Sequence, residues 1–212
     1  MGICYIIGAM ESAFPFQPKA GDCIIAADGG YRHLRAAGLK PDLVVGDFDS
    51  LGYVPEGEEI VRHPVRKDDT DTMLAVKLGL ARGYDRFLLL GGLGGRLDHT
   101  IANLHALAYL MNHGARGCLM GKSESAILFR DRSVFFYPEG RETVSVFAYG
   151  GIAMGVSLEG LEYPLTNAVL TPGFPLGVSN AFTGAPAKIS VEQGCLLVIW
   201  QDGIDRTDWL EV

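Results

Sequence analysis

The feature that most constrains the fold of this chain is a change in its hydrophobic period near residue 122. Before that point, short apolar runs end near Gly, Pro, Asp or His, and helical patterns lie between several of them. The runs are Ile3–Ile7, Cys23–Ala27, Leu43–Val45, Ile60–Arg62, Phe87–Leu90 and Cys118–Met120. Apolar residues recur at helical spacing over 70–82 and 97–112. Strands that alternate with helices predict a mostly parallel sheet with helices on both faces.

After residue 122 the helical patterns stop. Segments 143–150 and 187–194 alternate between apolar and polar residues, and segment 195–202 has the composition of a buried strand. Gly and Pro interrupt this half at short intervals, which is typical of antiparallel sandwiches and barrels. We therefore predict an α/β domain over residues 1–121, followed by a small all-β sandwich domain over residues 122–212.

Charge and composition restrict the partners of the chain. Its 212 residues carry a net charge of −7 with 48% hydrophobic residues, which suits a globular protein and argues against nucleic acid as a partner. No segment has the roughly 18 apolar residues that a membrane span requires. The four cysteines form no C-x-x-C pair. We expect buried thiols in a cytoplasmic protein, although the sequence alone does not exclude disulfide bonds.

Polar and glycine-rich clusters follow four strands of the first half. They are "AADGG" after the second strand, "GDFDS" after the third, "RHPVRKDDTD" after the fourth and "GGLGGRLDH" after the fifth. The carboxyl ends of parallel strands meet at one edge of a sheet, where ligands bind. We therefore expect these four clusters to converge on a single crevice.

Each cluster also has a simpler interpretation. Asp28 and Gly29 form a common turn dipeptide. Asp68, Asp69 or Thr70 can cap the helix over 70–82, with Asp71 at its positive end. The glycine-rich segment can serve as a flexible joint. His99 and Asn103, four residues apart, can mark a solvated helix face.

The combination of clusters favours a ligand site over four separate turns. It would bring together up to five carboxylates, those of Asp28, Asp47, Asp49, Asp68 and Asp71. Such a charge density needs a cation, and hard oxygen ligands suit Mg²⁺ bound together with phosphates. A glycine-rich turn before a helix can bind phosphate through its backbone N–H groups, and the Arg96 guanidinium can donate two hydrogen bonds to the phosphate oxygens. Although no P-loop motif is present, the parts indicate phosphoryl or pyrophosphoryl transfer.

The ordered motifs "ADGG", "GDFDS", "KDDTD" and "GGLGGRLDH" resemble those of the thiamine pyrophosphokinase family. The second half extends the resemblance with "SLEGLEYPL", "LTNAVL" and "GVSNAF", so that it spans residues from about 26 to 200. It implies transfer of a pyrophosphoryl group from ATP to the hydroxyl of thiamine, giving thiamine diphosphate and AMP. It also implies an α/β domain joined to a β-sandwich in a homodimer, with thiamine bound near the domain and subunit junctions.

The resemblance also implies roles for single residues. The Mg²⁺ ligands would be Asp47, Asp49, Asp71 and Asp68. The nucleotide would be held by Asp28, Gly29, Lys67, Arg96 and the backbone of Gly92, Gly94 and Gly95. Asp98 would accept a hydrogen bond or a proton from the thiamine hydroxyl, so that Asp49, Asp71, Arg96 and Asp98 form the catalytic set. Ser179 and Asn180 would contact the aminopyrimidine of thiamine, and Tyr163 would either stack on thiamine or only pack.

Two alternatives compete with this interpretation. The stretch "LVVGDFDSL" distantly resembles the D-x-D strand end of a Mg²⁺-dependent phosphohydrolase. In that class the nucleophilic aspartate follows the first strand, whereas here the pair follows the third. The second alternative is a non-catalytic protein that binds nucleotide or thiamine on the same fold. The presence of all the catalytic candidates argues against it.

Overall fold

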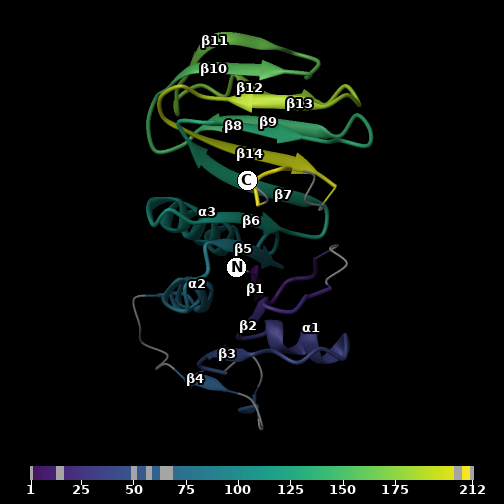
Figure 1. Cartoon of the computed structure of the whole chain (residues 1–212), viewed down its shortest axis with the longest axis vertical. Helices are drawn as coiled ribbons and strands as arrows, with labels where there is room; N and C mark the ends of the chain where they lie inside the picture. The colour runs from purple at the N-terminus through teal and green to yellow at the C-terminus, as the bar shows by residue number, and fades with distance from the viewer. Residues whose placement is uncertain are drawn as a thin grey trace. The chain divides into compact units, whose positions relative to one another are not determined.

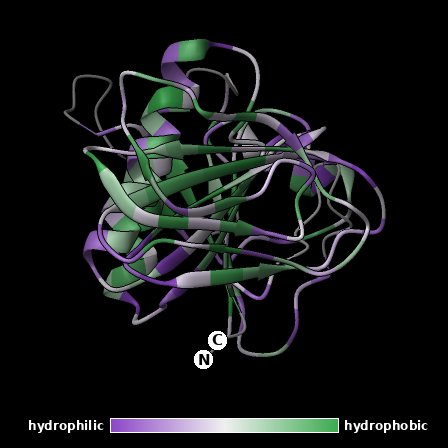
Figure 2. Cartoon of the chain, turned by 90° about the horizontal axis from the view of Figure 1, so that it is seen from above, coloured by the Kyte–Doolittle hydropathy of each residue, from purple (hydrophilic) through white to green (hydrophobic). Residues whose placement is uncertain are grey.

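The computed structural model describes residues 2–12, 17–48, 52–55, 59–62, 69–202 and 207–210. The chain divides into two compact units, Met1–Lys122 and Ser123–Val212. Figure 2 colours much of the strand ribbon as hydrophobic and many connecting loops as hydrophilic. Within the described part of the chain, no helix is both long and apolar enough to cross a membrane.

The first unit is built on a parallel sheet with the strand order β6-β5-β1-β2-β3-β4. Its strands are β1 (Cys4–Ile7), β2 (Cys23–Ala27), β3 (Leu43–Gly46), β4 (Ile60–Arg62), β5 (Arg86–Leu90) and β6 (Arg116–Met120). β1, β2 and β3 are buried along their whole length. These strands coincide with the apolar runs of the sequence, because a parallel sheet that is covered on both faces needs continuous apolar strands.

Three helices accompany this sheet in the described part of the first unit, namely α1 (Gly30–Ala36), α2 (Asp71–Ala81) and α3 (Leu97–Asn112). Gly79 of α2 lies so close to Cys4 and Phe87 that an added Cβ would come within 2.8 Å of both side chains. Leu34 of α1 instead shares a cavity wall with Ile7. Because Cys4 and Ile7 point to opposite faces of β1, α2 and α1 cover opposite faces, as Figure 1 shows.

In the described part of the first unit, the sequence did not predict helix α1, whereas α2 and α3 match the predicted helical segments. α1 has seven residues, and only Gly30, Tyr31 and Leu34 are buried. Gly29 precedes it and provides no side-chain cap. So short a helix leaves neither a periodic apolar stripe nor a capping signal in the sequence.

The first unit has a topological switch point between β1 and β5. The chain moves outward from β1 through β2 and β3 to β4, then returns through α2 to β5 on the other side of β1. The loops after β1 and β5 therefore leave the sheet side by side. The Gly8 amide donates to the Leu90 carbonyl at 2.7 Å, and the Met10 amide donates to the Gly91 carbonyl at 3.3 Å. Ligands of open α/β sheets bind at such a point.

The second unit consists of antiparallel strands in two sets, with the orders β12-β9-β14-β7 and β11-β10-β13-β8. The strands are β7 (Glu124–Arg130), β8 (Ser133–Phe136), β9 (Thr143–Ala148), β10 (Ala153–Glu159), β11 (Leu165–Leu170), β12 (Gly177–Ala181), β13 (Ala187–Ser190) and β14 (Cys195–Gln201). The ring of Phe136 lies 5.5 Å from the rings of Trp200 and Phe182, centroid to centroid. Phe136 and Trp200 belong to different sets, so these buried rings join the two sets in one core.

Candidate active site

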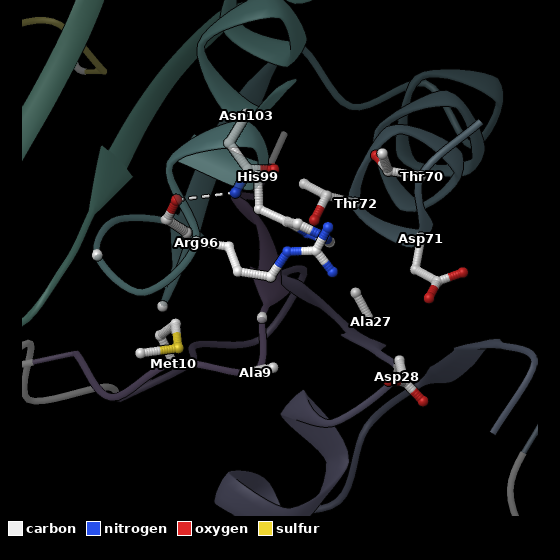
Figure 3. Close-up of a pocket in the computed structure, with 14 residues that line it drawn as sticks. Ala9, Met10, Ala27, Asp28, Thr70, Asp71, Thr72, Arg96, His99 and Asn103 are labelled. Atoms are coloured by element: carbon white, nitrogen blue, oxygen red, sulfur yellow. Dashed lines mark hydrogen bonds between the residues drawn. The ribbon is translucent and has the colours of Figure 1, made fainter. Parts of the chain in front are cut away.

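A cavity of about 360 Å³ lies at the carboxyl ends of the strands in the first unit. Five segments of the chain line it: the loops after β1, β2 and β5, the first turn of α2 and the first two turns of α3. Figure 3 shows the side chains of these segments around the same space. A cavity of this size suits a small-molecule ligand, and it lies beside the topological switch point.

Asp28 is the polar residue of this cavity that most needs a ligand. Its Oδ1 atom is buried and has no hydrogen-bond partner among the residues that the structure describes. Its backbone has a φ of 43°, and its amide donates to the Val45 carbonyl at 2.8 Å. A left-handed backbone and an unpartnered buried oxygen both cost free energy. A bound cation, or a water held by one, would satisfy that oxygen, so the residue fits a metal–nucleotide site.

The start of α2 brings a second carboxylate to the cavity. Thr70 caps this helix, because its hydroxyl accepts a hydrogen bond from the Met73 amide at 3.2 Å. Asp71 lines the cavity from the first turn, where the helix dipole favours a negative charge. Asp69 is engaged elsewhere, since both its carboxylate oxygens accept from Lys77 Nζ, at 2.8 and 2.7 Å.

The glycine-rich turn after β5 has a conformation that larger residues would not adopt. Gly91, Gly94 and Gly95 have φ values of 70°, 84° and 70°. A Cβ on Gly91 would lie 2.1 Å from the Met10 carbonyl oxygen. Asn103 of α3 is buried and donates from Nδ2 to the Gly92 carbonyl at 2.8 Å. The turn is therefore fixed in shape, and Asn103 does not belong to a solvated helix face.

Arg96 and Asp98 form a two-point ion pair at the start of α3. Arg96 Nε donates to Asp98 Oδ1 at 3.1 Å, and an Nη atom donates to Oδ2 at 2.6 Å. Figure 3 shows Arg96 extending across the cavity towards the start of α2. The Arg96 guanidinium lowers the pKa of the Asp98 carboxyl. Asp98 therefore stays ionised at neutral pH and acts as a hydrogen-bond acceptor.

The structure gathers part of the predicted site and leaves part of it undescribed. Asp28, Asp71, Gly92, Gly94 and Arg96 line the cavity together. Gly29 adjoins Asp28, Gly95 lies against Met10, and Asp98 pairs with Arg96. Asp47 follows β3, is half-buried and is not among the lining residues.

Asp49, Lys67 and Asp68 lie outside the described residues. Within the described ranges, no group of three His, Cys, Asp or Glu side chains could hold a metal ion. The four-aspartate metal set therefore stays a prediction.

The loop after β1 carries no motif that predicted a functional role. Gly8, Ala9 and Met10 line the cavity, yet their side chains carry no charge and no hydrogen-bonding group that would mark them as functional. The strand order could have revealed them, because β1 lies at the switch point. Thr72 and His99 also line the cavity, and His99 is exposed there, as the simpler interpretation of a solvated helix face allowed.

The predicted thiamine contacts of the second unit lie close to one another. Asn180 is buried, and its Oδ1 accepts from the amides of Tyr163 and Ala181, both at 2.9 Å. Its Nδ2 donates to the Tyr163 carbonyl at 2.7 Å. Asn180 thus fixes the backbone of Tyr163, whose side chain is 64% exposed. Ser179 is exposed, and its amide donates to Ser145 Oγ at 3.1 Å.

Comparison with known proteins gives one consistent family. Residues 18–119 match the model of the thiamin pyrophosphokinase catalytic domain, and residues 134–196 match that of the thiamin pyrophosphokinase vitamin B1 binding domain. The thiamine pyrophosphokinase of Bacillus subtilis is 27% identical over 183 residues, which are 82% of this chain and 85% of that protein.

Solved structures agree with these matches. The crystal structure of thiamine pyrophosphokinase from Bacillus subtilis superposes with a TM-score of 0.84 at 24% identity, covering 95% of this chain and 99% of that one. The thiamin pyrophosphokinase family protein from Enterococcus faecalis gives a TM-score of 0.81 at 26% identity, with the same two coverages.

Proposed function

The chain belongs to the thiamin pyrophosphokinase family, and we propose that its two units divide the reaction between them. The reaction transfers a pyrophosphoryl group from ATP to the hydroxyl of thiamine and gives thiamine diphosphate and AMP. In our proposal the first unit holds ATP and a divalent metal, and the second unit binds thiamine. The cavity that joins Asp28, Asp71, Arg96 and the glycine-rich turn carries this proposal.

Mg²⁺ is the metal that best suits the oxygen ligands of the first unit. Asp28 and Asp71 would hold it from the cavity wall, and Asp47, Asp49 and Asp68 are the further candidates from the sequence. Mg²⁺ usually takes one or two carboxylates together with substrate phosphates and waters. When bound, it would neutralise charge on the phosphate oxygens.

The remaining catalysis is positioning and electrostatic stabilisation by the chain itself. The fixed glycine-rich turn and the N-terminus of α3 present backbone N–H groups to the phosphates. Arg96 orients the β-phosphate and offsets the charge that builds on the oxygen leaving with AMP. Asp98 accepts the hydrogen bond of the thiamine hydroxyl and turns that oxygen towards the β-phosphorus. Its lowered pKa makes it a weak base, so positioning outweighs proton removal.

The second unit supplies the thiamine contacts in this proposal. Tyr163 stacks on the thiamine rings, Ser179 offers its hydroxyl to the aminopyrimidine, and Asn180 holds Tyr163 in place through the hydrogen bonds to its backbone. We further propose that two copies of the chain form a homodimer through this unit. Exposed apolar side chains at Val169, Phe174, Leu176 and Val178 support that surface.

We also propose a cytoplasmic location. All four cysteines are buried and free, and unpaired thiols persist in a reducing compartment.

One assay tests the reaction against its alternatives. The protein is incubated with ATP, MgCl₂ and thiamine, and the nucleotide and thiamine products are separated by chromatography. We expect AMP and thiamine diphosphate in equal amounts, with none of either after addition of EDTA and recovery after excess Mg²⁺. Phosphate released without AMP would indicate a phosphohydrolase. Binding of both substrates without any product would indicate a non-catalytic protein.

A further inference from the structure

Two of the four cysteines lie side by side at the amino ends of the central strands. Cys4 begins β1 and Cys23 begins β2, and the parallel register of these strands pairs the two residues with each other. The other two cysteines, Cys118 and Cys195, are paired in the sheet with residues of other types. Paired residues of neighbouring strands point to the same face, so Cys4 and Cys23 share one face of the sheet.

The backbone at this point has the spacing that a disulfide bond needs. Neighbouring strands lie about 4.8 Å apart, and the Cα atoms of a disulfide lie about 4.4–6.8 Å apart. The Ile3 amide, directly before Cys4, donates to Asp22 Oδ1 at 2.7 Å, which ties the amino ends of the two strands together. The two thiols are close enough to share a hydrogen bond. Their sulfur atoms can therefore be joined without a change of register.

The surroundings of the pair favour a thiolate on Cys23. The hydrogen bond from Cys4 is the main cause that lowers the pKa of the Cys23 thiol, to about 7. Arg82, at the C-terminal end of α2, adds to this effect, because its Nη1 donates to Cys23 Sγ at 3.7 Å. Burial and the charge of Asp42 act in the opposite direction. About half of the Cys23 thiol is therefore ionised at neutral pH, against a few per cent of a free cysteine.

Cys4 is the protonated and more deeply buried partner. The hydrogen bond to Cys23, together with burial, raises the pKa of the Cys4 thiol, which lies under Gly79 of α2. Arg82 reaches from Cys23 to the surface, where it donates to Glu59 at 2.8 Å, and its side chain is 33% exposed. Cys23 itself is only 3% exposed, so a small reagent suits the pair and a bulky one does not.

We infer that Cys4 and Cys23 form a reversible thiol–disulfide site whose oxidant is a hydroperoxide. The Cβ atoms of a disulfide lie about 3.8 Å apart, closer than neighbouring strands, so the bond is strained and a small thiol reduces it again. The site lies at the amino ends of β1 and β2, whereas the loops that line the candidate active site follow their carboxyl ends. The inference therefore does not rest on the proposed function.

The chemistry is a two-electron oxidation in two steps. The Cys23 thiolate attacks one oxygen of the hydroperoxide, the O–O bond breaks, and the leaving oxygen takes a proton and departs as an alcohol or as water. Cys23 is then a sulfenic acid. The Cys4 sulfur attacks the Cys23 sulfur, the S–O bond breaks, and the hydroxyl leaves as water with the Cys4 proton. The two thiols are thus oxidised to one disulfide, and the hydroperoxide is reduced.

The experiment uses the full chain, freshly reduced, freed of reductant and treated with a small excess of hydrogen peroxide at neutral pH. After catalase is added, the remaining thiols are blocked with N-ethylmaleimide in denaturant, and the peptides are analysed by mass spectrometry. We expect a peptide pair linked through Cys4 and Cys23, with Cys118 and Cys195 blocked. Dithiothreitol added before the blocking step should return all four cysteines to the blocked form.

Single substitutions test the order of the two steps. Cys4→Ser should accumulate a sulfenic acid on Cys23, which a 1,3-diketone captures. In Cys23→Ser, Cys4 should be oxidised at least about tenfold more slowly, because its thiol stays protonated. Cys118→Ser is the matched control, since Cys118 is buried in the same sheet, and it should form the disulfide as fast as the unaltered protein. Circular dichroism verifies that each variant folds.

The guanidinium beside Cys23 has its own test. Arg82→Ala should slow disulfide formation about threefold or more, because the thiolate loses a charged donor. Arg130→Ala is the matched control, since Arg130 Nε donates to Cys195 Sγ at 3.0 Å and so contacts a cysteine outside the pair. Its rate should equal that of the unaltered protein.

Two outcomes with the unaltered protein would overturn the inference. One is that Cys4 and Cys23 remain blocked by N-ethylmaleimide after peroxide treatment, or become linked only in denaturant. The other is that Cys118 and Cys195 are oxidised as fast as the pair. A sulfenic acid on Cys4 in Cys23→Ser, with none on Cys23 in Cys4→Ser, would contradict the assigned nucleophile. None of these results depends on whether thiamine diphosphate is formed.

Discussion

The two units use their buried polar groups in opposite ways. In the first unit, Asp28 holds an oxygen in the cavity wall that has no hydrogen-bond partner within the described part of the chain. In the second unit, the amide of the buried Asn180 bonds to the backbone of Tyr163 in both directions. The first arrangement leaves bonding capacity for a ligand. In the second arrangement, the hydrogen bonds of Asn180 fix the backbone of Tyr163, whose aromatic ring is exposed.

This difference predicts how each unit contributes to the reaction. A preformed polar cavity stabilises charge, so changes in the first unit should act on turnover and on ATP. The exposed ring of Tyr163, whose backbone is fixed by Asn180, offers contact area to a ligand. Changes in the second unit should therefore act on the affinity for thiamine. Substitutions in the two units should therefore separate kcat and KM for ATP from KM for thiamine.

The largest expected effect follows the loss of a carboxylate from the cavity of the first unit. Asp71→Asn keeps the shape of the side chain and removes the charge that we assign to the metal. We expect turnover to fall by about 100-fold, a loss of roughly 2.7 kcal/mol of transition-state stabilisation. Initial rates of AMP formation at saturating ATP and thiamine measure it. The same loss is expected for Asp49→Asn from the sequence.

Asp69→Asn is the matched control for this prediction. Asp69 lies two residues away and pairs with Lys77 at 2.7 Å instead of lining the cavity. Its loss should leave turnover within about twofold, because this half-buried ion pair lies outside the cavity. Equal losses in Asp69→Asn and Asp71→Asn would show that the charge of the segment matters and that the cavity does not.

A smaller effect is expected when the phosphate contact is removed. Arg96→Ala should raise KM for ATP by about 10- to 30-fold, because charge-assisted hydrogen bonds to an ionised group are worth about 1.5–3 kcal/mol. Arg35→Ala is the control, since Arg35 is exposed on α1 and does not line the cavity. An effect of Arg96→Ala on KM for thiamine alone would contradict the division between the units.

The second unit should respond through thiamine. Tyr163→Ala should raise KM for thiamine by about tenfold, the value of about 1.4 kcal/mol of stacking, with KM for ATP unchanged. Tyr137→Ala is the matched control, because Tyr137 is also exposed in the same unit. Asn180→Ala should raise KM for thiamine as well and also lower the melting temperature, since it leaves the backbone groups of Tyr163 unpaired. An unchanged KM for thiamine in Tyr163→Ala would show that the Tyr163 ring does not contact thiamine and only packs against the protein.

The sequence predicted the strands of the first sheet well for a physical reason. A strand buried on both faces must be apolar throughout, so Leu43–Gly46 and Cys23–Ala27 stand out as uninterrupted runs. It also predicted where Asp28, Asp71 and Arg96 meet, because parallel strands deliver their loops to one edge. Both predictions depend on the order of strands and loops along the chain, and neither requires knowledge of individual side-chain contacts.

The features that the sequence missed depend on contacts between distant residues. Asn103 and His99 have the spacing of one helix face, and only the carbonyl of Gly92 decides that Asn103 is buried. Asn180 meets Tyr163, which lies 17 residues earlier in the chain. The loop of Gly8, Ala9 and Met10 contributes backbone and space instead of charge. The contacts of Asn103 and Asn180 become visible only in the tertiary structure, whereas the strand order alone would have indicated the loop after β1.

The smallest expected effect concerns the protonation of Asp98. The hydrogen bonds from Arg96 are the main cause that lowers the pKa of this carboxyl. In Arg96→Ala the pKa should rise towards the ordinary value of an aspartate, although the bond from the His99 amide to Asp98 Oδ1 at 3.0 Å remains and keeps it somewhat low. Arg96→Lys should give an intermediate pKa, because a lysine keeps the charge but loses the two-point geometry.

A carboxyl carbon NMR titration of the three proteins measures this order. Because the folded pKa of Asp98 lies below its unfolded value, the pair stabilises the fold above the unfolded pKa, and this stabilisation is lost as the pH falls through the folded pKa. Asp98 is exposed, so added salt should weaken the difference between the proteins. Identical titration of Asp98 in all three would mean that the ion pair does not form in solution.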